Sequence, residues 1–95
     1  MKEGFVYILT NRKGGVLYIG VTDDLARRLA QHRTGTVRGF AKKCNCDRLV
    51  WFERHENIHD ARIAERRMKA WKREWKIRRI EESNPGWDDL SSALV

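Results

Sequence analysis

Two short apolar segments near the start of the chain, separated by a turn that contains two glycines, limit its fold more than any other feature. Residues 4–10 (GFVYILT) and 16–21 (VLYIGV) have the length and the aromatic and β-branched content of buried strands. The residues between them, 11–15 (NRKGG), have the composition of a turn. We therefore expect a β-hairpin at the start of the fold.

The alternation of side chains along a strand places each of the two tyrosines on a defined face of the hairpin. Tyr7 is expected on the face opposite to Val6 and Ile8, because successive side chains point to opposite sides. Tyr18 shares its face with Gly20, which has no side chain and leaves space for another group to approach the backbone.

A helix is expected directly after the hairpin, over residues 24–33. Either Thr22 or Asp23 can serve as its N-cap, since both have side-chain oxygens that accept backbone hydrogen bonds. Three apolar side chains at helical spacing are expected to face the core: Leu25, Ala26 and Leu29. Residues 34–36 (TGT) end the helix, and 37–45 is polar and basic, as expected of a surface loop.

The second half of the chain predicts a strand followed by a long helical region. Residues 48–54 (RLVWFER) form the third strand, and their continuous apolar centre predicts the central position in the sheet. Residues 58–82 have helical periodicity, which predicts one long helix or two helices joined by a kink, with Asn57 as N-cap. Residues 83–86 (SNPG) stop the helix, 87–90 fold back onto the core, and the last five residues fray.

This order of elements predicts a single α+β domain over residues 1–95, with a three-stranded, mainly antiparallel sheet flanked by helices. No apolar run approaches the roughly 20 residues that a membrane span requires, and no signal peptide is recognisable. Cys44 and Cys46 are too closely spaced for a usual disulfide or a paired zinc knuckle, which predicts structural or incidental cysteines. We expect a cytoplasmic monomer without membrane contact.

The charge of the chain favours a polyanionic partner. Twenty Lys and Arg residues against 13 Asp and Glu give a net charge of +7, and such an excess binds nucleic acid with release of counterions. A basic surface without such a partner is the alternative. Nine basic side chains are expected to hold phosphates without reading sequence: Arg38, Lys42, Lys43, Arg66, Arg67, Lys69, Lys72, Arg73 and Lys76.

Several short motifs occur in a fixed order along the chain. Residues 5–7 read FVY and 18–20 read YIG, and Arg28 and His32 follow Gly20 by eight and twelve positions. The acid Glu65 then lies within the basic helical region, where residues 62–79 carry nine basic side chains and two acids, and residues 84–90 read NPGWDDL. Together these motifs resemble the GIY-YIG nuclease superfamily over nearly the whole chain, and within it a small stand-alone bacterial subfamily. The one visible departure is Phe5, where the family has a glycine.

The resemblance implies a divalent-metal-dependent endonuclease that hydrolyses phosphodiester bonds in DNA with low sequence specificity, in repair or recombination. Whether the substrate is DNA or RNA stays open, with DNA preferred. In this family scheme Tyr7 or Tyr18 accepts the proton of the attacking water. Arg28 lowers the pKa of a phenol and contacts the scissile phosphate, and His32 relays a proton or binds phosphate.

The same resemblance assigns the metal and one amide. Glu65 is expected to bind Mg²⁺ or Mn²⁺, since Mg²⁺ takes one or two carboxylates and keeps several waters. Glu53 is the second candidate ligand, and Glu65 could equally be the i,i+4 partner of Lys69. Asn84 is expected to line the site, and its alternative role is to cap the helix before Pro85.

Two other functions remain open from the residues alone. One is a nucleic-acid-binding module of the same fold without catalysis, and the other is a protein adaptor that uses the tryptophan-rich C-terminal helix. Trp71 and Trp75 could stack on bases, although their helical spacing favours positions in the core.

Overall fold

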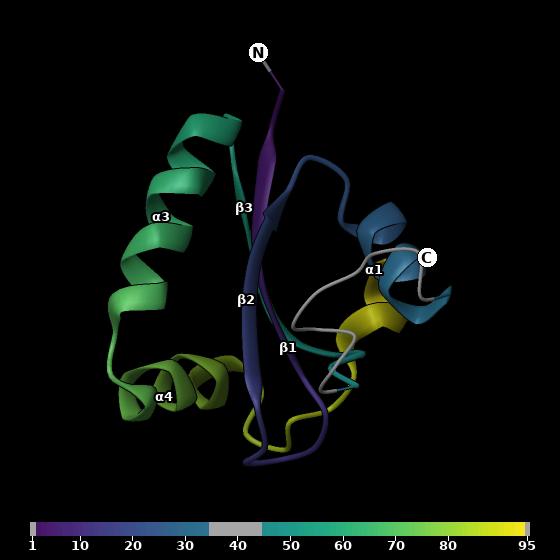
Figure 1. Ribbon diagram of the computed structural model, residues 1–95, viewed down its shortest axis with the longest axis vertical. Coiled ribbons are helices and arrows are strands. Elements are labelled where there is room, and N and C mark those ends of the chain that lie inside the picture. Colours follow the sequence, from purple (N-terminus) through teal and green to yellow (C-terminus); the bar gives the residue numbers. More distant parts are fainter. Residues whose placement is uncertain (1, 35–44, 95) are drawn as a thin grey trace.

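Three antiparallel strands separate two groups of helices in the computed structural model, which describes residues 2–34 and 45–94 (Figure 1). The elements are β1 (Gly4–Thr10), β2 (Leu17–Thr22), α1 (Leu25–Thr34), β3 (Arg48–His55), α3 (Ile58–Ala70), α4 (Arg73–Ser83) and the 3₁₀ helix η1 (Leu90–Leu94). Helices α3 and α4 lie on one side of the sheet, and α1 and η1 lie on the other (Figure 1). The α+β architecture predicted from the sequence is confirmed.

The strand order differs from the expectation that the third strand is central. The sheet has the order β2-β1-β3, so β1 is the central strand and β3 is an edge. The apolar centre of β3 is explained in another way. A register shift pairs Ile8 with Trp51 and Leu9 with Leu49, which leaves Val50 as an extra residue in a bulge. Helical layers on both sides of the sheet then bury this run although the strand has only one neighbour.

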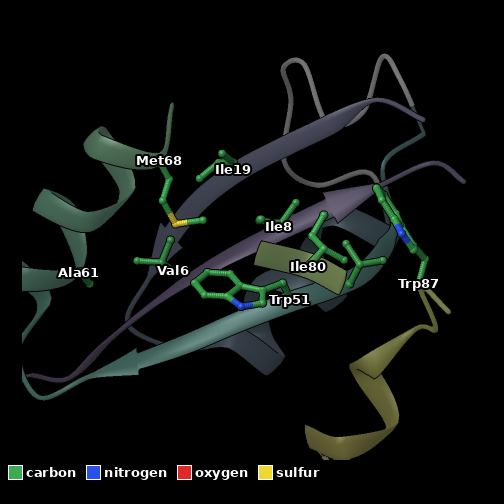
Figure 2. Packing of buried hydrophobic residues seen from close by; sticks show 9 residues of the cluster. Val6, Ile8, Ile19, Trp51, Ala61, Met68, Ile80 and Trp87 are labelled. Carbon is green, nitrogen blue, oxygen red and sulfur yellow. The ribbon is translucent and has the colours of Figure 1, made fainter. Parts of the chain in front are cut away.

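The core between the sheet and helices α3 and α4 is built around β1 and β3 (Figure 2). Nine buried side chains form it: Val6, Ile8, Ile19, Val50, Trp51, Ala61, Met68, Ile80 and Trp87. Gly4 allows α3 to approach the sheet closely, because a Cβ at this position would lie 2.7 Å from the Cβ of Ala61. The helical layer is therefore positioned by small residues at its N-terminal end as well as by large ones further along.

A second core lies on the other face of the sheet, beneath α1 and η1. Its buried members are Tyr7, Leu9, Leu25, Leu29, Cys46 and Leu49. Tyr7 therefore faces away from Val6 and Ile8, as strand periodicity predicts. The other cysteine, Cys44, lies outside the described residues.

Helix α1 differs in two details from the expectation. The side chain that caps it belongs to Asp24, whose Oδ1 accepts a hydrogen bond from the amide of Arg27 at 3.1 Å. Thr22 instead accepts from the amide of Asp24 at 3.1 Å and so supports the turn before the helix. Ala26 is exposed, and His32 takes the third inward position of the helix.

The helical region after β3 divides into two helices. Trp71 and Lys72 adopt extended backbone angles, with ψ of 151° and 148°, which ends α3 and starts α4 in a new direction. Asn57 caps α3 as predicted, its side chain accepting from the amide of Asp60 at 2.9 Å. The change of direction leaves Trp71 half-buried against the core, whereas Trp75 is 49% exposed. The core position favoured for Trp75 is therefore wrong.

The C-terminal segment returns to the sheet. Trp87 is 1% exposed and has a φ of 57°, an unusual angle for a bulky residue that turns its indole into the core. Beyond it, Leu90 and Leu94 of η1 pack against the cluster beneath α1. The last residues, which the sequence predicts to fray, form this 3₁₀ helix through Leu94.

None of the helices in the described part of the chain is long and apolar enough to cross a membrane.

Candidate active site

Two phenols and an imidazole from three elements meet on the α1 face of the sheet. The ring centroids of Tyr7 on β1 and Tyr18 on β2 are 6.3 Å apart. The ring of His32 from α1 approaches both in an edge-on manner, with centroids 6.2 Å from Tyr7 and 5.6 Å from Tyr18. The hydroxyl oxygen of Tyr7 lies 3.4 Å from Nε2 of His32. Residues distant in sequence thus form one polar cluster at the end of an apolar layer.

Gly20 allows this cluster to form. It is the register partner of Tyr7 across the hairpin, and a Cβ at Gly20 would lie 2.5 Å from both Cζ and the hydroxyl oxygen of Tyr7. The hydroxyl end of Tyr7 therefore crosses the edge strand β2 where that strand has no side chain. The space predicted beside Tyr18 is thus filled by Tyr7. Phe5, which departs from the family pattern, pairs regularly with Thr22.

Gly20→Ala is expected to destabilise the protein by about 1–3 kcal/mol, because the added methyl group must displace the Tyr7 ring or the strand. Urea unfolding measures the effect. The matched control is Gly86→Ala, where the nearest atom to a new Cβ is 3.4 Å away, in ordinary contact. A variant Gly20→Ala as stable as this control would contradict the close packing of Tyr7 on β2.

The surroundings of Tyr7 keep its phenol protonated. Burial raises the pKa of Tyr7 first of all, and the neighbouring Tyr18 and the charge of Glu65 raise it further, while the charge of Arg28 opposes them. Arg28 from α1 and Glu65 from α3 thus both act on the same hydroxyl group. Tyr7 is a proton donor at neutral pH and a poor base.

His32 is held in its neutral form. Burial lowers the pKa of His32, and the positive charge of Arg28 lowers it further. Its Nε2 faces Tyr7, and its Nδ1 is buried without a hydrogen-bond partner among the residues that the structure describes. A neutral imidazole that holds Tyr7 with one nitrogen can take up a proton.

Arg28 also lines a hollow of about 280 Å³ between the ends of β2, α1 and α3. Three cationic side chains border it, from Lys2, Arg28 and Arg62, together with the carboxylate of Asp23, which pairs with Lys2 at 3.3 Å. Arg62 was not singled out from the sequence, because it is one of many basic residues in its helix. Its position three residues before Glu65 places it on the same helical face, and this spacing could have identified it.

Glu65 is the candidate metal ligand that the structure places near the phenols. Its side chain is 16% exposed and pairs with Lys69 at 3.3 Å, so the i,i+4 interaction is present as well. No group of three or more metal-binding side chains occurs within residues 2–34 and 45–94. A single, partly buried carboxylate fits Mg²⁺, which binds one or two carboxylates together with waters and phosphate oxygens.

Glu53, the second candidate, lies elsewhere. It belongs to β3, which forms the sheet edge opposite to the β2 strand of Tyr18. Its carboxylate is 48% exposed and lies 3.0 Å from Nε2 of His55. The strand order therefore separates Glu53 from Tyr18, and its register partner Val6 faces away from Tyr7, so Glu53 lies on the other face of the sheet.

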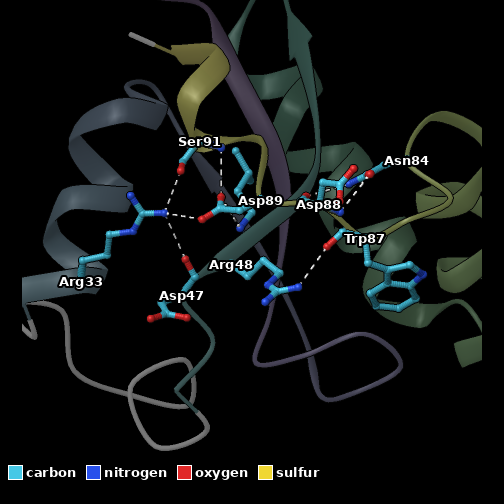
Figure 3. Close-up of polar contacts among 9 residues, drawn as sticks. Arg33, Asp47, Arg48, Asn84, Trp87, Asp88, Asp89 and Ser91 are labelled. Carbon is cyan, nitrogen blue, oxygen red and sulfur yellow. Dashed lines mark hydrogen bonds and ion pairs between the residues drawn. The ribbon is translucent and has the colours of Figure 1, made fainter.

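Asn84 has a structural role in the C-terminal motif, residues 84–90 (Figure 3). Its Nδ2 donates to the carbonyl oxygens of Val50 at 3.0 Å and Asp88 at 2.9 Å, and its Oδ1 accepts from the amide of Asp88 at 3.0 Å. The residue is 5% exposed and is also the C-cap of α4. These three bonds satisfy the amide within the protein, which favours the capping role over a place in the site.

Asp89 extends the same motif toward α1 (Figure 3). It accepts a hydrogen bond from Arg33 at 2.9 Å and bonds from the amides of Ser91 at 3.0 Å and Leu49 at 3.4 Å. Burial alone would raise the pKa of Asp89, but the bonds from Ser91, the charge of Arg33 and the Leu49 amide together lower it below its ordinary value. The motif thus joins α1, β3 and α4.

The predicted phosphate-binding residues fall into three groups. Arg38, Lys42 and Lys43 lie outside the described residues. The side chains of Arg66, Arg67 and Lys72 are exposed on α3 and at the start of α4. The others make protein contacts: Lys69 pairs with Glu65, Lys76 donates to the Lys69 carbonyl at 3.3 Å, and Arg73 donates to the carbonyls of Gly14 and Gly15 at 2.8 and 2.6 Å.

Comparison with known proteins matches most of the chain. A family model described as the GIY-YIG catalytic domain matches residues 3–78. A UPF0213 protein of Pediococcus pentosaceus is 30% identical over 81 residues, which are 85% of each chain. The UPF0213 protein in the ldhD 5′ region of Pediococcus acidilactici is 29% identical over 84 residues, 86% of each chain.

A solved structure has the same fold. The solution NMR structure of a UPF0213 protein from Bacillus halodurans superposes with a TM-score of 0.57 at 26% identity, covering 92% of both chains. The matched family supports a nuclease-type function that acts on nucleic acid. With the family model spanning all of its strands and the helix that carries Glu65, this chain belongs to the GIY-YIG catalytic domain family.

Proposed function

We propose that the chain is a divalent-metal-dependent endonuclease that hydrolyses phosphodiester bonds in DNA with low sequence specificity, in repair or recombination. One observation carries the proposal: Tyr7, Tyr18 and His32 are in ring contact, and the charges of Arg28 and Glu65 both act on the Tyr7 hydroxyl group. These residues offer a base, a proton relay, a cation and a carboxylate that can bind a metal, which are groups that phosphodiester hydrolysis uses.

The two phenols have different tasks in this proposal. Tyr18 is half-exposed, so a water molecule beside bound DNA can reach its hydroxyl group, whereas Tyr7 is 1% exposed. Tyr18 therefore accepts the proton of the attacking water. As Tyr18 takes this proton it passes its own to the Tyr7 hydroxyl group, which at the same time gives its proton to Nε2 of the neutral His32, so both phenols end protonated and the imidazole holds the proton.

Two groups of the site supply positive charge to the phosphate. The guanidinium group of Arg28 contacts two oxygens of the scissile phosphate and stabilises the negative charge that develops there. Glu65 would bind Mg²⁺ or Mn²⁺, and the ion would supply positive charge that stabilises the phosphate and the leaving group. Exposed cations such as Arg66 and Lys72 contact flanking phosphates, and such contacts carry no sequence information.

A plasmid nicking assay tests the proposal. The purified chain is expected to convert supercoiled plasmid to open circles with Mg²⁺ or Mn²⁺, to stop when EDTA is added, and to resume when the metal is restored in excess. Binding of the same plasmid is followed in parallel, with and without metal. Product formation that is insensitive to EDTA, or no product at all, would contradict the proposal.

A non-catalytic nucleic-acid-binding module is the second candidate. Two features favour it. Glu65 is already engaged in an ion pair with Lys69 instead of a metal, and the raised pKa of Tyr7 prevents this phenol from acting as a base. In the nicking assay this candidate predicts salt-sensitive binding of DNA without product under any metal condition.

A further inference from the structure

A second hollow lies on the helical layer, away from the tyrosines. It has a volume of about 220 Å³ and is lined by two indoles, two guanidinium groups and one carboxylate: Trp71, Trp75, Arg78, Arg79 and Glu82. Helix α4, which carries most of these side chains, is on the side of the sheet opposite to α1 (Figure 1). None of the residues that line it belongs to the candidate active site, so the hollow is separate from that site.

Trp75 is the unusual member of this set. At 49% exposed, it is one of two large apolar side chains that reach solvent among the described residues, the other being Ile63 at 47%. Exposing an indole leaves much of its large apolar surface in water, which is unfavourable unless a partner covers it. The extended backbone at Trp71 and Lys72 turns α4 so that Trp75 points away from the core.

Arg79 lines the hollow while stacking on two indoles. Its guanidinium carbon lies 4.9 Å from the ring centroid of Trp71 and 5.9 Å from that of Trp51. Both distances fall within the range of a cation–π interaction. The other three lining side chains, Trp75, Arg78 and Glu82, are exposed to solvent.

The chemistry of the walls selects a flat, neutral group that has negative charge beside it. An indole face favours a flat ring, and the carboxylate of Glu82 repels a phosphate inside the hollow while accepting a hydrogen bond from a ring N–H or amino group. The exposed guanidinium group of Arg78 suits a phosphate on the solvent side of the hollow. The volume is smaller than that of a typical drug-sized pocket, which limits the ligand to one ring system.

We propose that this hollow binds one unpaired base of a nucleic acid strand, stacked on Trp75, with the adjacent phosphate held by Arg78. The proposal rests on the nuclease function above and extends it to the class of substrate. A base inside a duplex is stacked on both faces and cannot enter, so the protein prefers DNA with a single-stranded segment over fully paired DNA.

The test is a binding titration with fluorescein-labelled DNA in EDTA, which prevents cutting. Each variant is titrated with a short single strand and with the same sequence as a blunt duplex, by anisotropy. Trp75→Ala is expected to weaken single-strand binding by about 5- to 100-fold, the range that loss of one base–aromatic stack produces, and to leave duplex binding within about twofold. Trp75→Phe, which keeps a ring, recovers most of the loss.

The matched control is Ile63→Ala, which removes an equally exposed apolar side chain from α3. A loss of single-strand binding no larger for Trp75→Ala than for this control overturns the base site while the nuclease proposal stands. A wild-type chain that binds neither DNA overturns both. Sedimentation of the same samples tests whether a second copy of the chain covers Trp75 instead. A dimer that dissociates on Trp75→Ala would show this and overturn the base site.

Discussion

Glu65→Gln is expected to lower the nicking rate at saturating DNA by about 1000-fold or more, while DNA affinity stays within about threefold. The reason is that the amide is nearly isosteric but cannot hold a divalent cation as a carboxylate does. A metal that stabilises developing charge contributes several kcal/mol to the transition state, and each 1.36 kcal/mol corresponds to about a factor of ten in rate. The measurement is single-turnover plasmid nicking with Mg²⁺ and Mn²⁺.

Lys69→Ala is the matched control, because it breaks the same ion pair and leaves the carboxylate in place. It is expected to weaken DNA binding through the loss of one cation, yet to keep the turnover of bound DNA within a few-fold. An i,i+4 ion pair on a helix contributes about 0.3–0.5 kcal/mol to stability, so neither variant is expected to unfold the protein. If Glu65→Gln and Lys69→Ala turn over bound DNA at the same rate, Glu65 only stabilises the helix, and its role as metal ligand is contradicted.

Asn84→Ala is expected to destabilise the protein by about 3 kcal/mol, because it leaves one buried backbone group of Val50 and two partly buried groups of Asp88 without their partners. This is a large share of the roughly 5–10 kcal/mol that holds a domain of this size together. The urea midpoint should fall by about 2–3 M if the m-value is about 1 kcal/mol per M. Turnover by the folded fraction should change by no more than a few-fold.

Two further variants define the role of this amide. Ser83→Ala, at an exposed neighbour in the last turn of α4, is expected to change stability by less than about 0.5 kcal/mol. Asn84→Asp keeps the acceptor and removes the two donated bonds, so its stability should fall near that of Asn84→Ala. A stable but inactive Asn84→Ala variant would return the residue to the active site, as the family resemblance implies.

Local patterns in the sequence predicted most elements of the fold. The hairpin follows from two apolar segments and a Gly-Gly turn, and the cap at Asn57 follows from the first turn of α3. Arg28 and His32, one helical turn apart, were both singled out by their positions after Gly20, and the structure places His32 on the phenols with Arg28 close enough to lower its pKa. Each of these features depends on residues within one or two turns of the chain, which a single sequence contains.

Pairings between distant segments could not be obtained in this way. The apolar run of β3 suggested a central strand, but a bulge at Val50 and two helical layers bury it at the edge. Trp71 and Trp75 have the same helical spacing to the core, yet a change of backbone direction between them exposes only the second. Only the tertiary structure places Arg62 of α3 and Arg28 of α1 around the same hollow.

The sequence by itself determined the order and type of the elements and supplied the chemical groups of the site, because hydrophobic periodicity and turn chemistry act over short distances. Only the tertiary structure decided which groups meet: Tyr7 over Gly20, His32 between two phenols, and Glu65 rather than Glu53 near Tyr7. The physical reason is that strand order and helix direction result from packing over the whole chain, and a residue's own neighbours do not encode that packing.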